Sequence, residues 1–201
     1  MAGLVLYDNP ASSNALKVRF LLAELGLEHE RVEIPLERPR PTHYTDLNPV
    51  GGIPAIDDDG FRLAESNAIL RYLARREGRA DLYPADPREA ARVDWLLDVW
   101  STAVRPAFFP FERAAGIVGP ADPERVEAAR NAAVEVLDAV ERLVADGGTM
   151  TGTFTIADVC AAPTLFRSRK LPLELERWPR LAAIRESVTS RTAFAAAGPV
   201  R

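Results

Sequence analysis

Residues 4–36 of the chain have the sequence LVLYDNPASSNALKVRFLLAELGLEHERVEIPL, which contains three hydrophobic patterns in succession. The apolar run at residues 4–7 predicts a short buried strand. Apolar side chains at helical spacing within residues 18–25 predict an amphipathic helix, and Gly26 supplies its end. Residues 28–36 alternate between polar and apolar and predict a second strand. The stretch therefore predicts a β-α-β unit.

The following residues predict two antiparallel strands and a helix. Residues 53–56 and 61–63 flank Asp58-Asp59-Gly60, which is a hairpin signal. Residues 66–76 then have the apolar spacing of a helix. The order β-α-β followed by β-β-α predicts a mixed four-stranded sheet with helices on both faces, in a first domain that spans residues 1–78.

Convincing strand signals disappear in the second half of the sequence, where residues 86–201 predict an all-helical domain. Asp86-Pro87 and Asp122-Pro123 each place a capping residue before a proline at the first helical position. Thr155 and Asp158 have the spacing of a capping box before another apolar helix. The predicted fold class is α+β, with a small mixed-sheet domain followed by an all-α domain.

Composition excludes several functional classes. The formal net charge of -4 argues against a nucleic-acid-binding surface, which is usually basic. A single cysteine, Cys160, excludes an internal disulfide and multi-cysteine metal sites, and two histidines leave little material for another metal centre. No stretch approaches the roughly 18 apolar residues of a membrane span. We therefore expect a cytoplasmic protein with no metal and with neither nucleic acid nor membrane as a partner.

Three short segments of the first domain carry candidate chemistry. Ser12 precedes a helix whose free N–H groups and dipole favour an anion or a thiolate. Pro54 begins a strand, and a cis bond before it would turn the backbone of Ile53 outward to bind an extended peptide. Glu65 and Ser66, at the next helix start, can hold an amino-acid head group. Each feature alone also fits ordinary capping or turn chemistry, so the argument rests on their order within one frame.

Taken together, these segments resemble the glutathione transferase superfamily, in particular bacterial serine-type members of the theta- and zeta-like classes. The resemblance rests on SSNALKVR at residues 12–19, NPVGGIP at residues 48–54 and LAESNAILRYL at residues 63–73. WLLDVW at residues 95–100 and FTIAD at residues 154–158 extend it into the second half. It implies a thioredoxin-like N-terminal domain, a helical C-terminal domain, a homodimer, and glutathione as co-substrate.

The resemblance also implies which residue activates the thiol. Ser12 is at the position of the catalytic serine, which donates a hydrogen bond to the thiolate of glutathione. Tyr7, near the end of the first strand, is the alternative, because other classes use a tyrosine there. Ser13-Asn14 departs from the Ser-Cys pair that is typical of the zeta isomerases.

Four residues are implied to bind glutathione. Ile53, next to a cis Pro54, would pair through its backbone with the cysteinyl part, and Glu65 and Ser66 would hold the γ-glutamyl group. Gly52 stands where the family often has a side chain that contacts the glycyl carboxylate.

A pocket for a small hydrophobic electrophile is expected in the second domain. Phe108 and Phe111 lie on a proline-interrupted segment and are its candidate lining, with helix-core packing as the alternative. The predicted function is conjugation of a glutathione thiolate to such electrophiles. The alternatives are a non-catalytic ligand-binding or interaction protein and a glutathione-dependent isomerase, dehalogenase or peroxidase.

Overall fold

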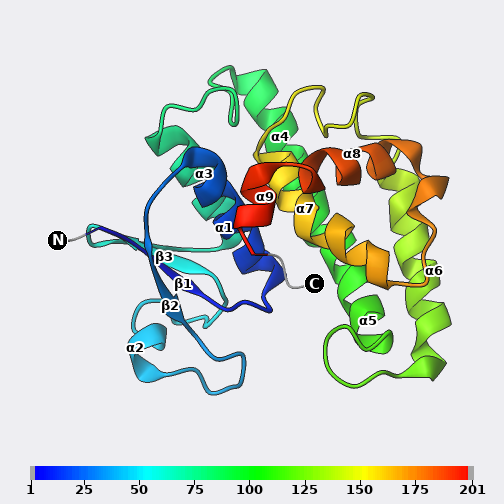
Figure 1. The fold of residues 1–201 in the computed structure, drawn as a ribbon, viewed down its shortest axis with the longest axis horizontal. Coiled ribbons are helices and arrows are strands. Elements are labelled where there is room, and N and C mark those ends of the chain that lie inside the picture. Colours follow the sequence, from blue (N-terminus) through cyan, green and yellow to red (C-terminus); the bar gives the residue numbers. More distant parts are fainter. Residues whose placement is uncertain (1–2, 199–201) are drawn as a thin grey trace. The chain divides into compact units, whose positions relative to one another are not determined.

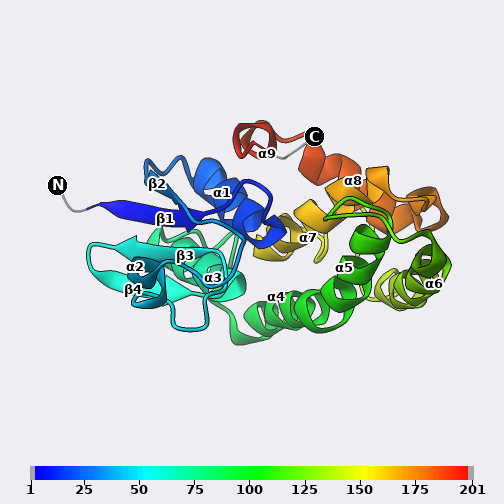
Figure 2. The same cartoon turned by 90° about the horizontal axis from the view of Figure 1, so that it is seen from below.

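The computed structural model describes residues 3–198, which form two compact units (Figures 1 and 2). The first unit contains residues 3–80 together with 191–198, and the second spans Asp81–Ser190. The second unit differs from the predicted domain 86–201 at both ends: it begins at Asp81, and residues 191–198 belong to the first unit.

The first unit contains a four-stranded mixed sheet in which β1 lies between a parallel and an antiparallel neighbour. In spatial order the strands are β2 (Glu30–Glu33), β1 (Leu4–Asp8), β3 (Ala55–Asp58) and β4 (Phe61–Ala64). β2 runs parallel to β1, whereas β3 is antiparallel to both β1 and β4. This arrangement confirms the predicted mixed sheet.

Two helices of the first unit carry the apolar faces that the spacing predicts, and they pack against each other. α1 (Ser13–Leu25) ends at Gly26, whose φ of 65° is left-handed and suits glycine. α3 (Ser66–Arg76) follows β4 after one residue. The apolar side chains that these helices bury include Val18, Leu21, Leu22, Ile69, Leu70 and Leu73.

A second buried cluster connects the short helix α2 (Thr42–Thr45) to the sheet. Its fully buried members are Ile34, Tyr44 and Ala55. The ring of Tyr7 on β1 packs against this cluster, with its centroid 5.9 Å from that of Tyr44. Since side chains alternate along a strand, Tyr7 faces α2 and its neighbour Leu6 faces the opposite side of the sheet.

The C-terminal helix α9 (Thr192–Ala196) packs on α1, which explains why its segment belongs to the first unit. Phe194 meets Phe20 edge to face, with ring centroids 5.2 Å apart. Arg191 forms an ion pair with Glu24 in the last turn of α1. A buried aromatic contact and an ion pair thus anchor this short helix. Neither contact can be predicted from local sequence periodicity.

All described residues of the second unit lie in helices, turns or loops, which confirms the predicted all-helical half. Its α-helices are α4 (Pro87–Val99), α5 (Arg105–Ala114), α6 (Pro123–Val140), α7 (Ile156–Arg167) and α8 (Pro179–Thr189). A π-helical segment, Trp100–Val104, joins α4 to α5. Within residues 3–198, no helix is both long and apolar enough to cross a bilayer.

One of the two predicted proline-linked caps is confirmed and the other is wrong. Asp86 accepts hydrogen bonds from the N–H groups of Arg88 at 2.9 Å and Glu89 at 3.0 Å. Asp122 makes no side-chain cap bond, and its carboxylate instead pairs with Arg125 at 3.2 Å. An arginine one turn away thus competes successfully for the acid that the Asp-Pro pattern assigns to the helix end.

The capping box at the start of α7 is confirmed. The hydroxyl of Thr155 accepts from the N–H of Ala157 at 3.3 Å, and the Asp158 carboxylate accepts from the N–H of Thr155 at 2.8 Å. Asp158 also accepts from the N–H of Met150 at 2.7 Å. Burial raises the pKa of Asp158 from an ordinary value of 3.8 to about 6, although the backbone donors oppose the shift.

Asp158→Asn is expected to lower the free energy of unfolding at pH 5 by about 1–3 kcal/mol, because both oxygens of the neutral carboxyl keep a lone pair for a backbone N–H, whereas the amide nitrogen has none and leaves one N–H buried without a partner. A carboxyl whose pKa is raised by folding stabilises most below pH 4, and that contribution is lost as the pH rises through about 6. Urea unfolding of both proteins from pH 4 to 7.5 should therefore show an advantage of the wild type that shrinks with pH. An advantage that grows with pH would contradict the assignment.

Candidate functional site

Ser12 lies in the turn between β1 and α1 and is the N-cap of α1. Its Oγ accepts a hydrogen bond from the N–H of Ala15 at 3.2 Å. Its own hydroxyl donates to the carbonyl of Ile53 at 3.4 Å, which is long for an O–H donor. The hydroxyl can therefore readily redirect this weak hydrogen bond to a stronger, anionic acceptor at the helix start.

Asn9 fixes the turn that carries Ser12. Its Nδ2 donates to the carbonyl of Ile34 at 2.9 Å, and its Oδ1 accepts from the N–H of Ala11 at 2.9 Å. The carbonyl of Asn9 accepts from the N–H of Ser12, also at 2.9 Å. The backbone before the helix is thereby tied to the end of β2.

The Ile53–Pro54 peptide bond is cis, as predicted. Strand β3 begins directly after it at Ala55, so the backbone of Ile53 lies just beyond the strand ladder. The preceding carbonyl, of Gly52, accepts from Nδ2 of Asn48 at 2.8 Å and from the hydroxyl of Tyr44. Burial raises the pKa of Tyr44, which keeps this phenol protonated as a donor.

Glu65 has a strained backbone at the start of α3. Its φ of 69° is left-handed, a conformation that costs a non-glycine residue about 1–3 kcal/mol and that clusters at functional sites. Its carbonyl accepts the first helical bond, from the N–H of Ile69 at 3.0 Å, and Ser66 lies buried in the first turn. A Cβ built on Gly52 would lie 4.0 Å from Oε1 of Glu65, so the carboxylate faces the segment before Pro54.

Three segments that are distant in sequence therefore meet at one edge of the sheet. Ser12 contacts Ile53, Glu65 faces Gly52, and Pro54 and Ser66 adjoin them along the chain. The arrangement offers the starts of two helices, a serine hydroxyl, a carboxylate and a strand-like backbone. Tyr7, the alternative activator, packs against the cluster that also includes Ile53.

Two arginines that the motifs do not mark lie beside the same segment. Nε of Arg40 donates to the carbonyl of Gly51 at 3.1 Å, and the guanidinium of Arg38 reaches the same oxygen at 3.5 Å. They follow the second strand in a proline-rich stretch that has no periodicity. No local sequence signal marks them, because only the fold brings them to Gly51.

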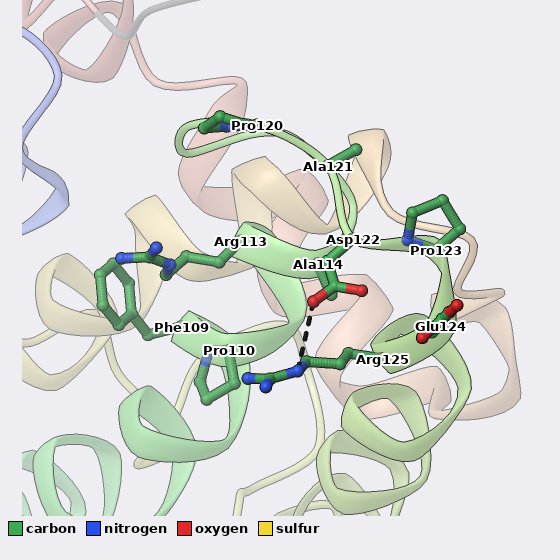
Figure 3. Close-up of a pocket in the computed structure, with 10 residues that line it drawn as sticks. All are labelled: Phe109, Pro110, Arg113, Ala114, Pro120, Ala121, Asp122, Pro123, Glu124 and Arg125. Carbon is green, nitrogen blue, oxygen red and sulfur yellow. Dashed lines mark ion pairs between the residues drawn. The ribbon is translucent and has the colours of Figure 1, made fainter.

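Phe108 and Phe111 have no exposed surface, as core packing requires. Their assignment to the electrophile pocket stays a prediction. Their neighbour Phe109 is 41% exposed and lines a cavity of about 600 Å³ between the end of α5 and the start of α6, shown in Figure 3. Arg113 and the Asp122–Arg125 ion pair give this cavity a polar rim (Figure 3).

A mixed sheet with a cis proline before its third strand, followed by an all-helical unit, defines a thioredoxin-like domain joined to a helical one. A family model described as "Glutathione S-transferase, N-terminal domain" matches residues 2–75. A second, "Glutathione S-transferase, C-terminal domain", matches residues 123–187. The chain belongs to the glutathione S-transferase family. The predicted fold class and the predicted glutathione-dependent enzyme class are confirmed.

Individual relatives match along nearly the whole chain. Maleylacetoacetate isomerase of Rhizobium meliloti is 32% identical over 98% of this chain and 96% of its own length. Glutathione S-transferase 3 of Zea mays is 34% identical over 96% of this chain and 92% of its own. The crystal structure of a glutathione transferase homologue from Lodderomyces elongisporus, with two GSH per subunit, has a TM-score of 0.86 at 21% identity and covers 98% of both chains. At that identity the likeness concerns the fold.

Proposed function

We propose that this protein binds glutathione at the edge formed by Ser12, Ile53 and Glu65 and ionises its thiol with the hydroxyl of Ser12. The observation that carries the proposal is the convergence of these three segments, with a 3.4 Å contact between Ser12 Oγ and the Ile53 carbonyl. An extended peptide that pairs with the backbone of Ile53 brings its thiol beside Ser12. The α-amino group of its γ-glutamyl part then meets the Glu65 carboxylate, and Ser66 and the start of α3 receive the α-carboxylate.

The magnitudes are sufficient for this chemistry. A free thiol has a pKa of about 8.5, and lowering it by about two units takes about 2.7 kcal/mol. A hydroxyl that donates to a charged acceptor supplies ~1.5–3 kcal/mol, and a helix N-terminus supplies ~0.3–1 kcal/mol. Ser12 at the start of α1 provides both contributions.

The leading reaction is transfer of an alkyl or aryl group to glutathione from a small hydrophobic electrophile. The thiolate forms a carbon–sulfur bond, the bond to the leaving group breaks, and the leaving group departs with its electron pair. Arg38 and Arg40 supply positive charge for the glycyl carboxylate, in place of the side chain that Gly52 lacks.

A second candidate reaction is glutathione-dependent isomerisation, which the relatives named maleylacetoacetate isomerase favour. There the same thiolate adds to a cis carbon–carbon double bond, the resulting single bond rotates, and elimination regenerates the thiolate. Glutathione is consumed in the transfer but not in the isomerisation. Assaying an aryl halide and maleylacetoacetate side by side, with glutathione quantified in both, separates the two reactions.

A non-catalytic ligand-binding role is the remaining alternative, and it requires that glutathione bind without ionisation of its thiol. Equilibrium binding of glutathione, with one or two other low-molecular-weight thiols in parallel, tests whether glutathione is the native thiol. A cytoplasmic location stays a prediction and agrees with a co-substrate that is kept reduced there.

Ser12→Ala is expected to raise the pKa of bound glutathione by ~1–2 units, because the charge-assisted hydrogen bond to sulfur is lost. Glutathione affinity should change little, since other residues hold the peptide. Titration of thiolate absorbance measures the pKa, with Tyr7→Phe as the matched control. A shift in Tyr7→Phe with none in Ser12→Ala would transfer the role to Tyr7.

Ser66→Ala is expected to do the reverse and to weaken glutathione binding by a factor of ~10–100, with little change in the thiol pKa. The reason is the loss of a buried donor to the α-carboxylate, which is a charged acceptor. Calorimetric titration measures the affinity. In a separate variant, Arg40→Gln removes a positive charge from the proposed site of the glycyl carboxylate. This variant should also bind glutathione more weakly, and its remaining affinity should depend less on salt concentration. Unchanged affinity in Ser66→Ala would remove Ser66 from the site.

We also propose a homodimer. Phe61 on the edge strand β4 is 49% exposed, with its ring 4.9 Å from that of Tyr72 on α3, and Val50 is 73% exposed. The adjoining rings of Phe61 and Tyr72 form a contiguous apolar patch, and such patches mark surfaces that another chain covers.

Sedimentation equilibrium at micromolar protein is expected to give twice the 22.0 kDa mass of one chain. Phe61→Asp should shift the equilibrium toward the single chain, because it places a charge on the proposed apolar contact. Arg62→Glu, a charge change at the exposed neighbouring position, is the control. A 22.0 kDa species for the wild type would refute the dimer.

A further inference from the structure

Arg19 is a buried arginine of α1 that contacts the turn leading to Ser12. Its side chain is 4% exposed, and one guanidinium nitrogen, Nη1, donates to both carboxylate oxygens of Asp8, at 2.8 and 2.9 Å. The same nitrogen lies 3.4 Å from the carbonyl of Asn9, and Nη2 lies 3.4 Å from the carbonyl of Pro10. These two carbonyls belong to the backbone directly before Ser12.

The C-terminal segment completes the surroundings of this guanidinium. Nε of Arg19 donates to the carbonyl of Ala197 at 2.9 Å. That carbonyl is held in place because Phe194 packs on Phe20 and because Arg191 pairs with Glu24. The guanidinium thus connects β1, the β1–α1 turn and the C-terminal segment.

Only an arginine can make this set of contacts. The planar guanidinium presents five N–H donors in a fixed fork, whereas a lysine ammonium is a compact charge with three donors and cannot serve these four acceptor groups. Asp8 is 1% exposed and also forms an ion pair with Arg31, which approaches from the surface side. Neutralising the charge of Asp8 therefore does not by itself require Arg19. The contacts that distinguish Arg19 from Arg31 are those to the turn and to Ala197.

We propose that Arg19 is a positioning residue for Ser12. Through the carbonyls of Asn9 and Pro10 it holds the Ser12 hydroxyl at the thiol, and the docked C-terminal segment supplies the remaining contact of its guanidinium. The inference rests on the proposed role of Ser12. A turn released from Arg19 lets the Ser12 hydroxyl move away from the sulfur, and the thiolate loses its best donor. Glutathione affinity is left to Ile53, Glu65 and Ser66.

The test is the thiol pKa of bound glutathione in Arg19→Lys, read from thiolate absorbance, with the affinity measured in parallel. The pKa should rise by about 0.5–1 unit while the affinity changes less than about twofold. Arg31→Gln is the matched control, because it removes the other partner of Asp8 without touching the turn, and its thiol pKa should stay that of the wild type. An equal shift in both variants would overturn the proposal in favour of an effect of the Asp8 charge.

The same substitution in the Ser12→Ala background shows whether Arg19 acts through Ser12. There Arg19→Lys should add no further pKa shift, since the group that it positions is gone. Additive shifts would overturn the proposal. A shift in Ser12→Ala with none in Arg19→Lys would refute this inference alone, whereas no shift in Ser12→Ala would refute the proposed activation itself.

Thermal unfolding shows whether Arg19→Lys folds. Should it not fold, Phe194→Ala provides the test, because it loosens the C-terminal segment and leaves Arg19 in place. A raised thiol pKa at unchanged glutathione affinity in this variant supports the proposal. An unchanged pKa overturns it.

Discussion

The antiparallel register of β3, with β1 on one side and β4 on the other, is the constraint on which the site depends. Ala55, the first residue of β3, stands opposite Tyr7 near the end of β1 and opposite Ala64 at the end of β4. The segments that follow β1, precede β3 and follow β4 must therefore meet at one edge of the sheet. Ser12, Ile53 and Glu65 are the residues that the chain places there. Strand pairing, rather than any contact among the three side chains, brings them together.

Two left-handed residues sit at this edge for different reasons. Gly51 has a φ of 69°, which favours glycine, and a Cβ there would lie 3.3 Å from Cγ of Arg40, so the arginine side chain would have to shift slightly. Glu65 has the same φ without the freedom of glycine. A glycine there would relieve the strain but would lose the carboxylate. The conformation is therefore one that the rest of the first unit must stabilise, and it agrees with the proposed role of that carboxylate in binding.

Local patterns predicted the strands, both long helices of the first unit and the cap at Ser12, because each is determined by residues within a few positions, whereas the cis bond before Pro54 was predicted from the resemblance. Contacts between distant residues escaped prediction for the same reason. Helix α9 joins the first unit through Phe194 and Arg191, which have partners in α1 more than 160 residues away. Arg40 was missed because only the fold brings it to Gly51, and Asp122 because Arg125 competes for its carboxylate. The structure brings together the motifs on which the resemblance rests, since their spacing reflects the strand register, and the roles of their residues stay predictions.

The proposed roles of the site residues also separate binding from activation. A hydrogen bond from Ser12 to sulfur gains most of its strength when the sulfur is charged, so it contributes to ionisation and little to the affinity for the neutral thiol. A backbone pairing at Ile53, or a carboxylate that meets an ammonium group, is the same in both protonation states and contributes to affinity alone. With the proposed roles, the first unit would present an ionised thiol to different partners without a change in its own residues. Transfer and isomerisation need the same thiolate and differ only in the fate of the carbon–sulfur bond. The choice between them therefore lies with the groups that surround the electrophile.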